Sequence, residues 1–251
     1  MCIACMRRSY PYILKEDIEE PVICAGGQLI GGRTKQKDSF AIFRNECVVV
    51  ADGVGGMPHG DIASRLAVET AIWGYKQIRL RPFYWRDKKL FIKRIFRSTN
   101  LAVWQKQKED GYSDGLATTL SVIIIGSQKC WAGTVGDSRV ILYRDGLIDF
   151  LTPPDANSTG FLTRAIGTQR LGIIPHIAVE RFVAKDIIIA ATDGITDFIS
   201  EDEMRAICEI CGDTKESLSN AVEHILTSAG HHGSTDNMTV VIVKRLRSSI
   251  T

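Results

Sequence analysis

Four short acidic patches lie where the sequence predicts that strands begin or end. In chain order they are Lys37-Asp38-Ser39, Asp52-Gly53-Val54-Gly55-Gly56, Thr192-Asp193-Gly194 and Asp236-Asn237. The second and third follow the apolar runs 47–51 and 187–191, and the fourth precedes the run 238–243. Because a buried carboxylate without a counter-charge is costly, a cluster of them predicts bound cations. Oxygen ligands with no His or Cys nearby favour Mg²⁺ or Mn²⁺ over Zn²⁺.

The pattern of apolar and polar residues predicts the elements that hold these patches in place. Strands are expected near residues 22–29, 39–43, 46–51, 118–125, 129–135, 140–144, 147–151, 177–181, 186–191 and 238–244. Helices are expected near residues 61–80, 87–109, 201–210 and 214–229. Asp145-Gly146 predicts a hairpin turn, since both residues tolerate positive φ. Because the helices come in pairs and do not alternate with strands, an α+β sandwich of antiparallel sheets is favoured over a doubly wound sheet.

The composition narrows the class of protein. The 251 residues are 45% hydrophobic and 24% charged, which is ordinary for one large domain or two small ones. A net charge of +2 gives no reason to expect nucleic acid or a membrane as the main partner. No apolar run approaches the roughly 18 residues of a bilayer span. The N-terminus carries its charge after a very short apolar piece, the wrong order for a secretory signal, so we expect a cytoplasmic protein.

The 7 cysteines are odd in number and widely scattered, so a disulfide framework is not expected. Cys2-x-x-Cys5 and Cys208-x-x-Cys211 have the spacing of zinc ligands. The first pair falls in an end of the chain expected to fray, and the second falls in an expected helix. Half-buried thiols are therefore favoured over a zinc site.

Eight ordered segments together are similar to a known family. They are Arg33-(x)₄-Asp38-Ser39, Val50-Ala51-Asp52-Gly53-Val54-Gly55-Gly56, Gly60-Asp61-Ile62-Ala63-Ser64, Ala117-Thr118-Thr119-Leu120, Val135-Gly136-Asp137-Ser138-Arg139, Leu162-Thr163-Arg164-Ala165-Ile166-Gly167, Thr192-Asp193-Gly194-Ile195-Thr196-Asp197 and Asp236-Asn237-Met238-Thr239-Val240. In this order they resemble the metal-dependent serine/threonine protein phosphatases of type 2C. The resemblance runs from about residue 22 to 244, and the lack of a His directly after Asp52-Gly53 resembles the bacterial branch.

The resemblance implies a fold and a metal site. The fold would be a four-layer αββα sandwich, with two antiparallel sheets flanked by helix pairs and a dimetal site at one end. Asp52 would bridge two Mn²⁺ or Mg²⁺ ions, and the Gly53 carbonyl would bind one of them. Asp193 and Asp236 would hold the other ion. Asp137, together with Asp193, would hold a weaker third ion.

The resemblance also implies an activity. Asp38 would hydrogen-bond the metal-bound water, and Arg33 would grip the substrate phosphate as a bidentate fork. A hydroxide bridging the two ions would hydrolyse phosphoserine or phosphothreonine in proteins, which reverses a protein kinase. The expected partners are phosphorylated protein substrates and a cognate serine/threonine kinase, and the chain is expected to be a monomer. Residues 1–21 would be an N-terminal lead-in, and residues 22–251 a single type 2C catalytic domain.

Lys37 is the main departure from the family pattern, in which the residue before Asp38 is usually acidic. A cation beside a dimetal site should weaken metal binding by Coulomb repulsion, unless its long side chain swings to solvent. A tuned but active enzyme is one interpretation. A catalytically weak pseudo-phosphatase that binds phosphoproteins is the alternative, and a metal hydrolase of small phosphoesters is a second one.

A basic stretch covers parts of the first two expected helices, with only Asp87 opposing it. Its cations are Lys76, Arg79, Arg81, Arg86, Lys88, Lys89, Lys93, Arg94 and Arg97. A solvated helix face is the favoured interpretation, and a docking surface for an acidic partner is the alternative.

Overall fold

The computed structural model describes residues 21–81 and 87–247, and within them two antiparallel sheets of five strands each stack face to face. The first sheet has the order β1-β10-β9-β6-β7, with bounds Val22–Leu29, Met238–Arg245, Ile187–Ala191, Arg139–Arg144 and Leu147–Phe150. The second has the order β2-β3-β4-β5-β8, with bounds Asp38–Phe43, Cys47–Asp52, Leu120–Ile125, Lys129–Val135 and His176–Arg181. The lead-in expected for residues 1–21 lies outside the described residues, apart from Pro21.

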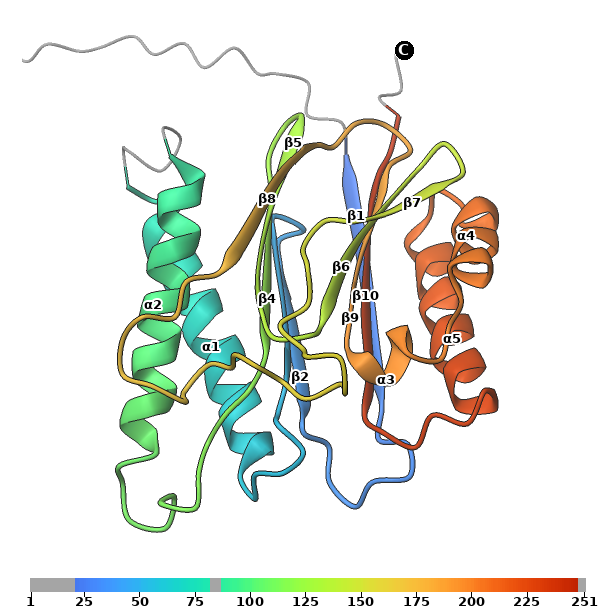
Figure 1. Ribbon diagram of the computed structural model, residues 1–251. Helices are drawn as coiled ribbons and strands as arrows, with labels where there is room; N and C mark the ends of the chain where they lie inside the picture. The colour runs from blue at the N-terminus through green and yellow to red at the C-terminus, as the bar shows by residue number, and fades with distance from the viewer. Residues whose placement is uncertain (1–20, 82–86, 248–251) are drawn as a thin grey trace, which may run out of the picture.

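Two pairs of helices cover the outer faces of the sandwich. Helices α1 (Gly60–Ile78) and α2 (Lys88–Lys106) lie beside the second sheet, and α4 (Glu201–Ile210) and α5 (Lys215–His231) lie beside the first, as Figure 1 shows. The expected four-layer αββα sandwich is therefore confirmed. None of the helices in residues 21–81 and 87–247 has the length and apolar character that a bilayer span requires.

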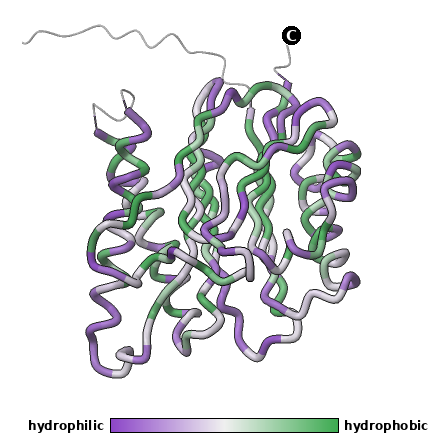
Figure 2. Tube along the Cα trace, in the orientation of Figure 1, coloured by the Kyte–Doolittle hydropathy of each residue, from purple (hydrophilic) through white to green (hydrophobic). Residues whose placement is uncertain are grey.

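Three hydrophobic clusters fill the spaces between the four layers, and strand alternation assigns residues to them. In β3, Val48 and Val50 pack between the sheets, whereas Val49 packs toward α1 and α2. In β10, Val241 packs between the sheets and Ile242 packs toward α5. Because both faces of these strands are buried, the strands are continuous apolar runs, and Figure 2 shows hydrophobic residues concentrated along the central strands.

The local predictions differ from the structure mainly at element ends. Asp145 and Gly146 have φ of 49° and 81°, as the predicted β6–β7 hairpin requires. Helix α2 was expected to reach residue 109 but ends at Lys106, and the turns after it continue the chain toward β4. The sequence did not predict α3 (Asp193–Thr196), because four residues are too few to show a helical period.

Candidate metal centre

All the carboxylates expected to bind metal meet at one end of the sandwich, because antiparallel strands start and stop there. Asp38 begins β2 and lies directly opposite Asp52, which ends β3. Asp193 follows β9 and opens α3, while Asp236 lies just before β10. Asp137 lies in the turn between β5 and β6. Figure 1 shows α3 at this end of the sandwich.

A cavity of about 330 Å³ opens at this end, and six of the seven expected site residues line it. The six are Arg33, Asp52, Gly53, Asp137, Asp193 and Asp236. The seventh, Asp38, lies under the cavity with only 3% of its surface exposed. The fold thus brings together residues that lie up to 203 positions apart in the sequence.

Burial and mutual repulsion raise the pKa values of the clustered carboxyls. The pKa of Asp52 lies well above its ordinary value, first because the group is buried and then because Asp38, Asp193 and Asp137 repel its charge. Burial likewise raises the pKa of Asp38 to about 6 and that of Asp137 to about 6. Burial followed by the charge of Asp236 raises the pKa of Asp193. Arg33, Lys35 and Lys37 also line the cavity, yet the pKa values of these carboxyls remain raised.

Unpartnered oxygens show that the cluster fits added cations. One carboxylate oxygen each of Asp38, Asp137 and Asp193 is buried without a hydrogen-bond partner. A buried acceptor without a donor is costly, and a divalent ion satisfies such oxygens. The donor set consists of carboxylates and a backbone carbonyl, which suits Mg²⁺ or Mn²⁺.

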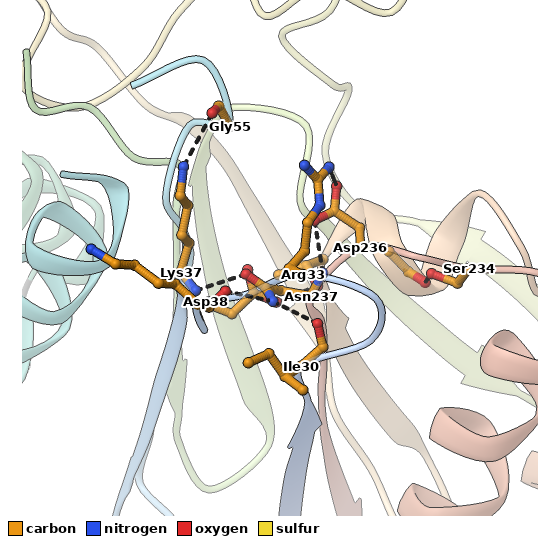
Figure 3. Close-up of polar contacts among 11 residues, drawn as sticks. Ile30, Arg33, Lys37, Asp38, Gly55, Ser234, Asp236 and Asn237 are labelled. Atoms are coloured by element: carbon orange, nitrogen blue, oxygen red, sulfur yellow. Dashed lines mark hydrogen bonds and ion pairs between the residues drawn. The ribbon is translucent and has the colours of Figure 1, made fainter. Parts of the chain in front are cut away.

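As the side chains stand, however, no three Asp, Glu, His or Cys side chains of the described residues converge closely enough to hold one ion. Asp236 shows one reason, because its Oδ2 lies 2.6 Å from Nη2 of Arg33 (Figure 3). Both side chains are partly exposed, at 52% and 39%, so solvent weakens this pair. One oxygen of Asp236 is therefore engaged by Arg33, and the other accepts from the amide of Asn237 at 2.7 Å.

The backbone at Gly53 leaves no space for a side chain. A Cβ atom there would lie 2.2 Å from the carbonyl oxygen of Gly60 at the start of α1. The Gly53 amide donates to the Lys37 carbonyl at 3.1 Å, and the Gly53 residue forms an isolated bridge with Thr118. Glycine is thus required for the close approach that places this carbonyl in the cavity wall.

Lys37 neither swings freely to solvent nor pairs with a metal-site carboxylate. Its Nζ donates to the carbonyl oxygens of Gly55 at 3.1 Å and Met57 at 3.0 Å, and Figure 3 shows the side chain reaching toward Gly55. Its backbone nitrogen donates to Oδ1 of Asn237 at 2.7 Å. The ammonium therefore ties the loop after β3, which carries the Gly53 carbonyl, to the start of β2.

Asn237 is a positioning residue that the sequence did not single out. Its Nδ2 donates to the carbonyl oxygens of Ile30 at 2.9 Å and Lys35 at 3.1 Å, while its Oδ1 accepts from Lys37. These bonds hold the loop that carries Arg33 against the start of β10 (Figure 3). Its place directly after Asp236 in a family-like segment was the signal that could have found it.

Thr192 positions the buried Asp38. Its hydroxyl donates to Oδ2 of Asp38 at 2.9 Å and accepts from the backbone N–H of Thr239 at 3.0 Å. The hydroxyl thus fixes one oxygen of Asp38 and leaves the other without a partner. Sequence reasoning missed this role as well, because a threonine at a strand end has many other uses.

The cysteine pairs show no zinc site in the part of the chain that is described. Cys208 in α4 and Cys211 at the end of that helix are free, buried thiols of the core, and burial raises the pKa of both. Cys2 and Cys5 lie outside the described residues.

The αββα fold and a carboxylate pocket with an arginine at its rim define a metal-dependent phosphoester hydrolase. The family model described as protein phosphatase 2C matches residues 31–227. The chain belongs to the protein phosphatase 2C family, the metal-dependent serine/threonine protein phosphatases, and its relatives are of the bacterial type.

Two curated relatives illustrate this similarity. The chain is 26% identical to the serine/threonine phosphatase Stp of Listeria monocytogenes over 235 residues, which cover 85% of this chain and 91% of the relative. It is 27% identical to the protein phosphatase PhpP of Streptococcus pneumoniae over 234 residues, which cover 84% of this chain and 92% of the relative.

Solved structures share the fold. The serine/threonine phosphatase PstP/Ppp of Mycobacterium tuberculosis superposes with a TM-score of 0.78 at 21% identity, covering 90% of this chain and 99% of that one. A PstP catalytic domain in complex with two manganese ions superposes with a TM-score of 0.74 at 23% identity, with the same coverage.

Proposed function

We propose that this chain hydrolyses phosphoserine and phosphothreonine in proteins at a dinuclear Mn²⁺ or Mg²⁺ site and so reverses a serine/threonine kinase. The observation that carries the proposal is the cavity that brings four Asp residues together with Arg33, beside carboxylate oxygens that are buried without partners. We propose also that residues 22–251 act as a single catalytic domain in the cytoplasm, that the chain works as a monomer, and that it takes phosphorylated proteins as substrates.

The proposed ligand roles are those that the family resemblance implies, and they are supported by the fact that these residues line one cavity. Asp52 and the Gly53 carbonyl would hold one ion, and Asp52, Asp193 and Asp236 the other. Asp137 lines the same cavity and would hold a weaker third ion with Asp193. When bound, such ions acidify water and neutralise the phosphate charge.

Side chains of the site would bind the phosphate and orient the attacking water. Arg33 lies at the half-exposed rim, where its planar guanidinium can exchange the Asp236 carboxylate for two oxygens of a phosphate. That exchange frees Asp236 to turn inward, so phosphate binding and completion of the ligand set favour each other. Asp38, fixed by Thr192 beneath the cavity, keeps one carboxylate oxygen without a partner, which would accept a hydrogen bond from the attacking water.

The pseudo-phosphatase alternative rests on Lys37, and its contacts weaken that argument. Lys37 lines the cavity, but its ammonium is held by two loop carbonyls and forms no ion pair with a described carboxylate of the site. Every expected metal-binding carboxylate is present in the cavity. A small-phosphoester hydrolase needs the same site, and the choice of substrate separates it from a protein phosphatase.

The decisive measurement is turnover of a phosphothreonine peptide with and without Mn²⁺, beside turnover of p-nitrophenyl phosphate. We expect metal-dependent release of phosphate from both, with the higher kcat/KM for the peptide. Absence of turnover of either compound at saturating Mn²⁺ supports the pseudo-phosphatase. A higher kcat/KM for small phosphoesters than for any phosphopeptide supports the second alternative.

A further inference from the structure

A second cavity, of about 380 Å³, shares no lining residue with the metal pocket and lies between α2 and the chain segment before β8. Lys93, Arg97 and Asn100 of α2 form one wall, and residues 170–175 form the other. We call this cavity the α2 groove. In Figure 1 the segment that forms the second wall runs across the front of the molecule to α2 before it turns into β8.

The α2 groove is preformed, because its second wall is held by side-chain hydrogen bonds. Nδ2 of Asn100 donates to the carbonyl oxygens of Gln169 at 2.9 Å and Arg170 at 3.2 Å, and Oδ1 of Asn100 accepts from the amide of Gly167 at 2.9 Å. Nη1 of Arg164 donates to the carbonyl oxygen of Ile174 at 2.7 Å. A ligand therefore meets a shaped surface and does not have to order it first.

The second wall carries hydrophobic side chains that the fold leaves in solvent. Leu171 is 57% exposed and Ile174 is 63% exposed, whereas Ile173 in the same wall is half-buried against the core and Pro175 is buried. Two neighbouring exposed apolar side chains beside a cavity are more typical of an interaction site than a single isolated one.

The groove is rimmed by cations that lack counter-charges. Lys93, Arg97 and Arg170 are exposed, and none of them is in an ion pair within the described residues. Neither α2 nor the wall segment 163–175 contains an Asp or Glu. Arg170 also stacks over the ring of Trp104, with 5.7 Å to the centroid, which holds its charge at the rim. The whole chain has a net charge of only +2, so this positive surface is local.

We propose that the α2 groove binds an acidic peptide segment with Leu- or Ile-like side chains, carried by the proteins on which the phosphatase acts. This inference rests on the proposed function. Acidic residues would pair with Lys93, Arg97 and Arg170, and the apolar side chains would cover Leu171 and Ile174. The apolar wall favours a peptide over nucleic acid, which would need stacking or phosphate contacts along its whole length.

The position of the groove explains how docking would serve catalysis. Leu162 lines the metal pocket, and residues 170–175 of the same connection line the α2 groove. A substrate held in the groove would be tethered near the metal pocket, which raises its effective concentration there without adding any contact to the phosphate itself.

Phage-displayed random peptides of about 12 residues, selected on the full-length chain, test the groove directly. We expect enriched peptides to combine acidic with Leu- or Ile-like residues. Fluorescence anisotropy should then show about tenfold weaker binding to the Lys93→Glu, Arg97→Glu double variant. Ile174→Ser should weaken binding at constant charge. The matched control Lys129→Glu, Arg181→Glu makes the same charge change at two exposed cations on β5 and β8 and should leave binding unchanged.

Joining an enriched peptide to a phosphothreonine peptide tests the link to catalysis. The fusion should raise kcat/KM over the phosphopeptide alone, and the Lys93→Glu, Arg97→Glu variant should abolish that gain while turning over p-nitrophenyl phosphate normally. No enrichment, peptides without acidic residues, or binding that survives in the groove variant would overturn the inference. So would groove-dependent binding of duplex RNA or anionic vesicles that displaces the peptides. If the parent chain turns over no phosphoester, the proposed function fails, but anisotropy still tests the groove.

Discussion

The carboxyl groups of the metal pocket and the carboxyl group of Asp155 lie at the same end of the sandwich, but their pKa values are shifted in opposite directions. Asp38 and Asp155 are almost equally buried, with 3% and 6% of their surfaces exposed. The pKa of Asp38 is raised to about 6, whereas the pKa of Asp155 lies below its usual value. Burial alone therefore cannot explain the difference, because burial raises both.

The difference lies in the donors that the chain supplies. Asp155 Oδ1 lies 2.7 Å from Nη2 of Arg164 and 2.9 Å from Nε2 of His176, and its Oδ2 accepts from the amide of Gly136 at 3.0 Å. These bonds outweigh burial. The carboxylates of the metal pocket have few such donors and retain unpartnered oxygens. A buried carboxylate with internal donors connects parts of the fold, whereas a cluster of carboxylates without such donors is a candidate site for a bound cation.

The two groups are also connected. Asp155 binds the amide of Gly136 through its side chain, and its own amide donates to the Gly136 carbonyl at 2.9 Å. Gly136 has φ of 106° and directly precedes Asp137. Asp155, whose oxygens have partners, thus fixes the turn that holds Asp137, a carboxylate of the metal pocket.

The largest effect should come from removing a charge from the metal pocket. Asp193→Asn should lower turnover by orders of magnitude, since a proposed ligand of the metals is lost. In metal-free protein the same change relieves repulsion, so thermal unfolding in EDTA should occur at the same or a higher temperature. The exposed carboxylate Asp149 offers the matched control, and Asp149→Asn should change neither quantity. Near-normal turnover of Asp193→Asn at low Mn²⁺ would contradict the proposed ligand role.

Removing the charge of Asp155, whose carboxylate has internal partners, should lower the stability of the fold. Asp155→Asn leaves Arg164 without its carboxylate and weakens the bond to Gly136. Because Arg164 is 32% exposed, solvent screens part of the loss, and we expect about 2 kcal/mol less stability in urea unfolding. Asp202→Asn is the control, because Asp202 pairs with Arg205 while 88% exposed and should cost little. Equal losses in the two variants would show that the Asp155 contacts add no stability beyond a surface pair.

The pH dependence of metal-free protein should separate the two groups further. For Asp137 the folded pKa of about 6 exceeds the unfolded value of about 3.9, so its contribution is full below about pH 4 and is lost as pH rises through 6. For Asp155 the folded pKa is lowered, so its contribution is present above about pH 4 and is lost as pH falls further.

Urea unfolding in EDTA across pH 3–7 measures these slopes. Asp137→Asn should flatten the decline in stability between about pH 4 and pH 7, and Asp155→Asn should flatten the decline at the acid end. Excess Mn²⁺ should reverse the decline near neutral pH in the parent chain. If the plots of unfolding free energy against pH are parallel for the parent and both variants, the proposed difference between Asp137 and Asp155 is wrong.

The smallest effect should come from Lys37, a cation that lies beside the metal pocket but binds backbone carbonyls. In Lys37→Glu the new carboxylate is repelled by the carbonyls of Gly55 and Met57 and turns toward the pocket. The Mn²⁺ concentration for half-maximal activity should fall by up to about tenfold, and KM should change less. Lys37→Met is the companion variant, which removes the loop bonds without adding a charge. If the Mn²⁺ titration curves of the parent and of Lys37→Glu are identical, the charge at position 37 has no effect on metal affinity.

Local sequence was sufficient for most elements of the sandwich. Strands such as β3 and β10 are buried on both faces, so they stand out as β-branched runs without help from the tertiary structure. Positive φ at Asp145 and Gly146 follows from their residue types alone. Three of the four acidic patches were placed at strand ends for the same reason, because each of them adjoins such a run.

Only the tertiary structure decided which carboxylates have partners. Asp155 pairs with Arg164 and His176, Lys37 with Gly55 and Met57, and these contacts depend on how loops from different strands meet. Asn237 reaches Lys37 across 200 residues because β1 and β10 pair. A residue's type fixes whether it can donate or accept, whereas its partner depends on distances that no local pattern encodes. The sequence therefore determined that negative charge collects at one end of the sandwich, and the packing of the two sheets determined which part of that charge is left for cations.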